Sequence, residues 1–104
     1  MIVDVRCYTI TPRKMKVYLE TFEKYALPVQ KRAGMNLLGY FVHSVGSLNK
    51  VTHLWGFDSL AHMEQLRAKR DADPAWAEYL GKTEGLVQAQ ENSITTPAPF
   101  SPIK

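Results

Sequence analysis

Cysteine is almost absent from this 104-residue sequence. Cys7 stands alone, so the chain can form no internal disulfide and has no cysteine cluster to bind a metal. Its neighbours are apolar and β-branched, and we interpret it as a buried, inert thiol in a strand. The three histidines lie on three separate segments, which does not fit the spacing of a metal site. We therefore predict no metal centre.

Long apolar runs and familiar cofactor motifs are also missing. No stretch of about 18 apolar residues could span a membrane, and the first residues lack the basic and apolar segments of a signal peptide. A cytoplasmic protein without a membrane span is therefore expected. The sequence has no glycine-rich dinucleotide motif, phosphate-binding loop or nucleophile elbow. His62 lacks the aromatic and polar neighbours that a haem pocket needs, and we predict no cofactor.

Positive charge is in slight excess but is not concentrated. Lysine and arginine total 13 against 10 aspartate and glutamate residues, which gives a net charge of +3. The one short basic run, Arg67, Lys69 and Arg70, stands where a helix is expected to end, and cations are favourable there because of the helix dipole. We interpret this run as a solvated helix end. Nucleic-acid-binding proteins present a clustered basic face, so no nucleic acid is expected as a partner.

What is present fits one small globular domain. Hydrophobic residues make up 45% of the chain and charged residues 22%, which are ordinary values that argue against disorder. The length leaves room for a single domain covering residues 1–104. A chain this short buries a modest core, which association with a second copy would enlarge.

The spacing of apolar residues predicts four strands and two helical regions in the order β-α-β-β-α-β. Strands are indicated by alternation of apolar and polar residues, and helices by apolar residues at three- and four-residue steps. The expected ranges are strands at 2–10, 36–45, 50–57 and 86–95, helices at 11–34 and 59–70, and a further short helix from residue 74.

Local signals mark the ends of these elements. Thr11 and Pro12 are expected to cap and begin the first helix, and Pro28 should kink it or end its regular part because proline lacks an N–H donor. Residues 46–49 are typical of a hairpin turn. In the second helical region, Ser59 and Asp73 are suited to cap the two successive helices.

The element order is that of the ferredoxin-like α+β fold, an antiparallel four-stranded sheet with helices on one face. The other face would be left bare, with more exposed apolar surface than a monomer usually shows. We therefore predict a homodimer in which two sheets pack face to face. The proline-rich segment 97–102 can form neither helix nor interior strand. It is expected to run extended over a neighbour, with Phe100 as its anchor.

Several segments, read in order, resemble the NIPSNAP family. They are RCYTITP at 6–12, LGYF at 38–41, GSLNKVTHLW at 46–55, DPAW at 73–76, QENSI at 90–94 and PAPFSP at 97–102. The resemblance covers essentially the whole chain, and the hairpin at 46–55 is its most specific part. It implies the fold of the dimeric α+β barrel proteins, which include cofactor-independent monooxygenases, lactone isomerases and haem-degrading enzymes. The family itself has no generally assigned reaction, so the resemblance leaves open whether this chain is an enzyme.

His53 and Trp55 are the first candidates for a functional role. They project from the same face of one strand, with Cα atoms roughly 6–7 Å apart. A histidine beside an indole in a cavity can shuttle a proton or donate a hydrogen bond against an aromatic wall. The alternative is a structural histidine bonded to a neighbouring strand, with Trp55 filling the dimer core.

Arg6 and Tyr8 share one face of the first strand. A charged group is rarely buried without a partner, so Arg6 either lies in a wet cavity or pairs with Asp4 or Glu91. As a site residue it would anchor an anionic ligand, and Tyr8 would donate a hydrogen bond. The alternative is a structural pair between Arg6 and Glu91, across strands or across subunits.

Two hypotheses about function remain. In the first, each subunit holds a small-molecule pocket between sheet and helices, suited to a small aromatic or anionic ligand. Its chemistry would be a cofactor-free proton transfer or addition of oxygen, with His53 as the acid–base group. Its polar lining would consist of Arg6, Tyr8, His53, Trp55 and Glu91. In the second, the chain is a non-catalytic binding or protein-interaction module in which the same residues hold the dimer together.

Overall fold

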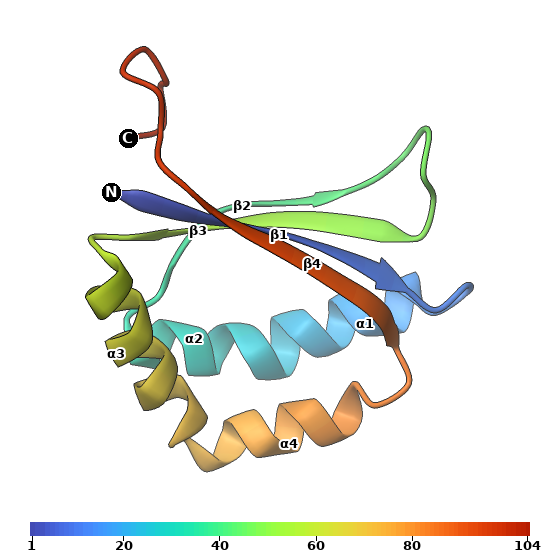
Figure 1. Cartoon of the computed structure of the whole chain (residues 1–104). Coiled ribbons are helices and arrows are strands. Elements are labelled where there is room, and N and C mark those ends of the chain that lie inside the picture. The colour runs from blue at the N-terminus through green and yellow to red at the C-terminus, as the bar shows by residue number, and fades with distance from the viewer.

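The computed structural model describes residues 1–104 as one antiparallel sheet with helices on one of its faces (Figure 1). The strands lie side by side in the order β2-β3-β1-β4. The elements are β1 (Ile2–Ile10), α1 (Met15–Thr21), η1 (Phe22–Ala26), α2 (Leu27–Ala33), β2 (Asn36–Val42), β3 (Lys50–Phe57), α3 (Leu60–Asp71), α4 (Pro74–Lys82) and β4 (Val87–Thr95). The predicted β-α-β-β-α-β order and ferredoxin-like fold class are confirmed, since α1, η1 and α2 form one helical region and α3 with α4 the other.

The central strands β1 and β3 set the two faces of the sheet. Arg6 lies opposite His53, and Asp4 lies opposite Trp55. Side chains alternate between faces along a strand, so these four side chains share the face that the helices cover. His53 and Trp55 are each only 2% exposed. The middle of this helix-covered face is therefore built from polar and aromatic groups.

The first helical region begins later than its sequence predicts. The helix starts at Met15, and Thr11 does not cap it. Instead the Thr11 hydroxyl donates a hydrogen bond of 2.6 Å to the carbonyl of Gly85, which lies two residues before β4. Residues 12 and 13 form a turn in which Arg13 adopts a positive φ of 69°. Thr11 therefore links two segments that are distant in the sequence instead of capping the helix.

Pro28 is accommodated by a wider helical turn. Residues Phe22–Ala26 form a π-helical turn, in which the N–H of Leu27 donates to the carbonyl of Phe22. The backbone hydrogen bonds here span five residues instead of four. This change comes just before Pro28, which has no N–H to donate. The regular helix is interrupted as predicted, but the chain resumes as α2 and continues to Ala33. Gly34, with φ of 88°, ends it in the left-handed conformation.

The second helical region follows its sequence signals closely. The Ser59 side chain accepts a hydrogen bond from the N–H of His62, and Asp73 accepts one from Ala75. Pro74 then occupies the first turn of α4. Leu60, the first residue of α3, is 55% exposed. Strand β2 ends at Val42, three residues earlier than predicted.

A cluster of aromatic side chains joins the first helical region to the sheet. Tyr18 is fully buried, and its hydroxyl lies 2.7 Å from the hydroxyl of Tyr40 on β2. Phe22 packs against Tyr40 with ring centroids 4.8 Å apart. Burial raises the pKa of both Tyr18 and Tyr40 well above the ordinary tyrosine value, so both hydroxyls stay protonated.

The face of the sheet opposite the helices is open in the single chain. Phe41, which lies opposite Thr52 on this face, is 55% exposed. The C-terminal tail leaves β4 on the side of the sheet away from the helices (Figure 1), and Phe100 is 90% exposed. Its anchoring role against a neighbour stays a prediction. None of the helices combines the length and apolar character needed to cross a membrane.

We expect the Tyr18–Tyr40 pair to be energetically coupled. Replacing Tyr18 by phenylalanine should lower the free energy of unfolding by about 1–3 kcal/mol, because the Tyr40 hydroxyl loses its only protein partner. The double variant Y18F/Y40F should cost less than the sum of the single variants. Urea unfolding of the four proteins measures this, and strictly additive losses would contradict the coupling.

Candidate functional site

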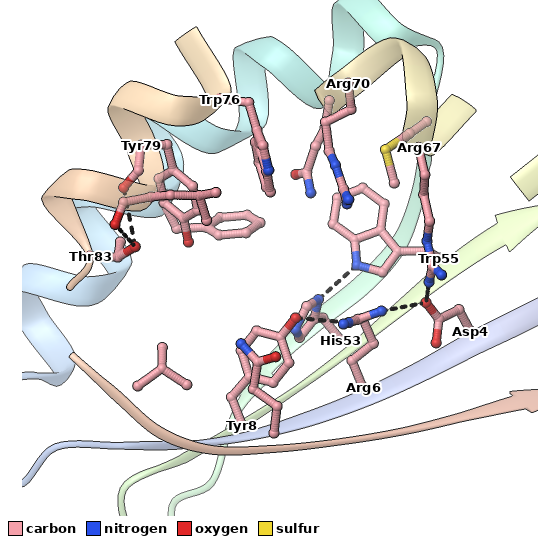
Figure 2. A pocket seen from close by; sticks show the side chains of 16 residues that line it. Asp4, Arg6, Tyr8, His53, Trp55, Arg67, Arg70, Trp76, Tyr79 and Thr83 are labelled. Carbon is pink, nitrogen blue, oxygen red and sulfur yellow. Dashed lines mark hydrogen bonds and ion pairs between the residues drawn. The ribbon is translucent and has the colours of Figure 1, made fainter. Parts of the chain in front are cut away.

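A cavity of about 240 Å³ lies between the sheet and the helices. Its floor comes from β1, β3 and β4, and its roof from η1, α2, α3 and α4 (Figure 2). It is lined by Asp4, Arg6, Tyr8, Phe22, Gln30, Met35, His53, Trp55, Arg67, Arg70, Trp76, Tyr79, Leu80, Thr83, Val87 and Gln90.

Four of the five side chains expected at a site line this cavity. They are Arg6, Tyr8, His53 and Trp55. Glu91 does not join them, because it lies opposite Cys7 in the strand register and therefore on the open face. Its neighbour Asn92 is the residue opposite Arg6. Of the two carboxylates expected for Arg6, Glu91 is therefore not its partner within the chain, because a step of one residue along a strand changes the face.

Asp4 is the carboxylate that Arg6 binds. The Asp4 side chain is 2% exposed, and its Oδ2 lies 2.9 Å from Nη1 of Arg6. Nη2 of Arg67, on α3, approaches the same oxygen to 2.6 Å. Nε of Arg6 also donates to the Tyr8 hydroxyl at 2.8 Å. One buried carboxylate therefore holds two arginines from different elements, and Arg6 is largely occupied by protein partners.

His53 makes a hydrogen bond that determines its protonation state. Nε1 of Trp55 donates to Nδ1 of His53 at 2.7 Å. An indole nitrogen can only donate, so Nδ1 must be unprotonated and the neutral ring carries its proton on Nε2. Nε2 is buried and has no hydrogen-bond partner in the protein. His53 thus carries a buried N–H donor that has no hydrogen-bond partner in the protein.

The surroundings of His53 keep the ring neutral. Its pKa is lowered to about 4, mainly by burial and also by the positive charge of Arg6, while Asp4 partly opposes them. The ring stacks on Tyr40, with centroids 4.5 Å apart, and meets Tyr8 edge to face at 4.7 Å. With Nδ1 engaged by Trp55, the geometry suits His53 as a hydrogen-bond donor better than as a general base.

The basic run on α3 does not lie in solvent as its sequence suggests. Arg67 and Arg70 both line the cavity, whereas Lys69 is exposed. The guanidinium of Arg70 lies 4.5 Å from the ring centroid of Trp76 on α4. A signal was present, because Arg67 follows the buried Met63 by four residues and Arg70 follows by three more. Both arginines thus continue the inward face of the helix.

The other histidines lie apart from the cavity. His43 shares a hydrogen bond of 2.7 Å with Thr52, and His62 accepts one from the N–H of Asp58 at 3.0 Å. No three side chains of histidine, cysteine, aspartate or glutamate lie close enough to hold a metal ion together. A second cavity of about 400 Å³ adjoins the first, with Gln30, Met35 and Trp55 lining both.

Comparison with known proteins gives the family. The NIPSNAP family model matches residues 3–102. The chain belongs to the NIPSNAP family. It is 35% identical to human NipSnap homolog 3A over 99 residues, which cover 93% of this chain and 39% of the human protein. The chain thus spans well under half the length of this curated relative.

Solved structures of NIPSNAP proteins share the fold. A NIPSNAP family protein of Agrobacterium tumefaciens with unknown function is 35% identical and superposes with a TM-score of 0.95, covering all of this chain and 94% of that one. A candidate antibiotic biosynthesis monooxygenase of Nitrosomonas europaea superposes with a TM-score of 0.65 at 8% identity, covering 93% of this chain and 98% of that one. The second likeness concerns the fold alone.

The buried neutral His53 should make stability depend on pH. The unfolded state binds a proton near pH 6.5 and the folded state only near pH 4, so stability is full above pH 6.5 and is lost as pH falls through this window. Between pH 7 and pH 5 we expect the free energy of unfolding to fall by about 2 kcal/mol from this group. Urea unfolding at both pH values measures the loss.

The variant His53→Asn provides the control for this experiment. The asparagine oxygen occupies the position of Nδ1 and can still accept from Trp55, but it does not titrate. H53N should therefore lose about 2 kcal/mol less than the wild type between pH 7 and pH 5. An identical loss in both proteins would show that another group is responsible.

Proposed function

We propose that this NIPSNAP protein binds a small aromatic or otherwise conjugated molecule, bearing an oxygen or acid group, in the cavity between its sheet and its helices. The observation that carries the proposal is the buried Nε2–H of His53, which has no acceptor in the protein. A buried donor without a partner costs about 1–3 kcal/mol, and a ligand oxygen would remove this cost.

The aromatic side chains that line the cavity favour a flat ligand. Tyr8, Phe22, Trp55, Trp76 and Tyr79 supply aromatic surface around the cavity. Such walls favour ring systems, and a few fixed polar groups orient them. The cavity volume of about 240 Å³ lies just below the usual range of about 300–1,000 Å³ for drug-sized ligands. A molecule with one ring suits this space.

For the reaction in this cavity, we propose cofactor-independent oxygenation or an isomerase-like proton transfer. Both reactions begin when a carbon-bound proton passes to solvent and the electron pair left behind moves onto a substrate oxygen, which becomes negatively charged; oxygenation then consumes molecular oxygen as the oxidant. The Nε2–H of His53 would stabilise that charge by donating a hydrogen bond, and the low dielectric of the cavity would strengthen it. The fold shared with a candidate antibiotic biosynthesis monooxygenase supports this class of reaction.

We also propose that two copies of the chain form a homodimer through the open faces of their sheets. Phe41 is more than half exposed there, and the adjoining Val5 and Leu54 are only partly buried. Native mass spectrometry of freshly purified protein should show a dimer, and a reproducible extra mass on it would identify the natural ligand. Replacing Phe41 by aspartate should shift the mass to that of a monomer. A wild-type monomer would contradict the dimer.

The ligand proposal is tested with two molecules of the same shape. Acetophenone carries a carbonyl oxygen where α-methylstyrene carries a CH2 group. Wild-type protein should bind acetophenone about tenfold more tightly, because only its oxygen accepts from His53. The chain has two tryptophans, Trp55 and Trp76, and both line the cavity. Their indole N–H signals in ¹⁵N NMR titrations therefore report binding.

The matched variant is again His53→Asn, which keeps an acceptor for Trp55 and lacks the Nε2–H. H53N should bind the two molecules equally. If it keeps the preference for acetophenone, His53 is not the donor. If H53N is destabilised or monomeric while its ligand binding is unchanged, the residue is structural and the interaction-module hypothesis gains support.

A further inference from the structure

The cavity carries more positive than negative charge. Three arginines line it, Arg6, Arg67 and Arg70, but Asp4 is its only carboxylate. His53 adds no charge near neutral pH, because its pKa is about 4. The lining residues therefore have a net charge of +2. Such an excess in a partly dehydrated space favours an anion from outside the protein.

The three arginines differ in where their ionic partners lie. Arg6 and Arg67 both contact Oδ2 of the buried Asp4. Arg70 is different, because its ionic partner is Asp71, outside the cavity lining, with a side chain that is 59% exposed. Exposed ion pairs contribute little and exchange readily. Nε and Nη2 of Arg70 each lie 3.0 Å from one Asp71 oxygen, and Nη1 has no partner in the protein.

Arg70 is nevertheless held in place. Its side chain is 18% exposed, and its guanidinium lies over the Trp76 ring at 4.5 Å from the centroid. Trp76 in turn packs against Tyr79, with ring centroids 5.0 Å apart. Figure 2 shows Arg70 pointing into the cavity beside Trp76, with Arg67 and Asp4 to one side and Tyr79 to the other. A cationic group and a flat aromatic wall therefore meet at the roof.

We propose that Arg70 selects an organic carboxylate as the ligand, with the carboxylate on its guanidinium and an aromatic or conjugated body against Trp76 and Tyr79. This inference rests on the proposed function and names the acid end of the same ligand. The planar guanidinium matches a carboxylate better than a lysine ammonium would. The adjoining second cavity leaves room for atoms beyond the first ring. The anion anchor is thus on α3, and Arg6 supports the floor through Asp4.

Benzoate and benzamide test this inference, because they share one shape and differ in charge. In wild-type protein, benzoate should bind about tenfold or more tightly than benzamide, as expected for hydrogen bonds to a charged group. The readout is the shift of the Trp55 and Trp76 indole signals, assigned with the variant W76F. In R70Q the preference should vanish, because benzoate loses far more affinity than benzamide when the positive charge is removed.

Two further variants sharpen the comparison. K69Q removes the same charge from an exposed position on α3 and should keep the preference for benzoate. R70K keeps the charge without the planar fork and should retain only part of the preference. R70K also serves as the test variant if R70Q does not give the dispersed NMR spectrum of a folded protein.

The outcomes separate this inference from the proposed function. If the wild type binds benzoate and benzamide equally, or if R70Q keeps the preference, Arg70 is not the anion anchor although the cavity binds ligands. If neither molecule nor acetophenone shifts an indole signal up to its solubility limit, the cavity is not a binding site and both proposals fail.

Discussion

The buried carboxylate of Asp4 is the interaction on which the arrangement of the site depends. It joins β1 to α3 by contacting Arg6 and Arg67 with one oxygen. A carboxylate that is 2% exposed needs such partners, because an unpaired buried charge is strongly destabilising. The pairing draws Arg67 towards the sheet and brings the last turns of α3 over the cavity. It also engages Arg6 and Arg67, whereas Arg70 pairs with the exposed Asp71.

His53 shows how neighbouring groups select one role from several. A histidine can be base, acid, donor or metal ligand, and its ring nitrogens are distinct. The Trp55 indole takes one nitrogen and burial keeps the ring neutral, so the role left to it is that of a donor through Nε2. At the other side of the cavity, Trp76 orients the guanidinium of Arg70. Both tryptophans therefore position a polar neighbour as well as filling space.

The fold and most of the floor of the site were predictable from the sequence. Alternation along the first strand placed Arg6 and Tyr8 on the same face of that strand, and alternation along the third did the same for His53 and Trp55. The register of the two strands shows that all four side chains share one face of the sheet. The roof was not predictable in the same way. Arg70 reads as a solvated helix end in a linear sequence, because nothing local shows that α4 folds back and places Trp76 beside it. The expectation that Glu91 lines the site was wrong for a related reason. The ends of a strand can be predicted from the sequence, but they do not show which residue of the neighbouring strand lies opposite each position.

The sequence by itself determined the order of the elements, the caps at Ser59 and Asp73 and the two-faced character of each strand. These features depend on residues a few positions apart, so local propensity and periodicity suffice. Only the tertiary structure decided which carboxylate binds Arg6, which histidine nitrogen carries the proton and which arginine of the cavity pairs with an exposed carboxylate instead of the buried one. Each of these depends on contacts between residues distant in the chain, and on the burial that makes such contacts strong.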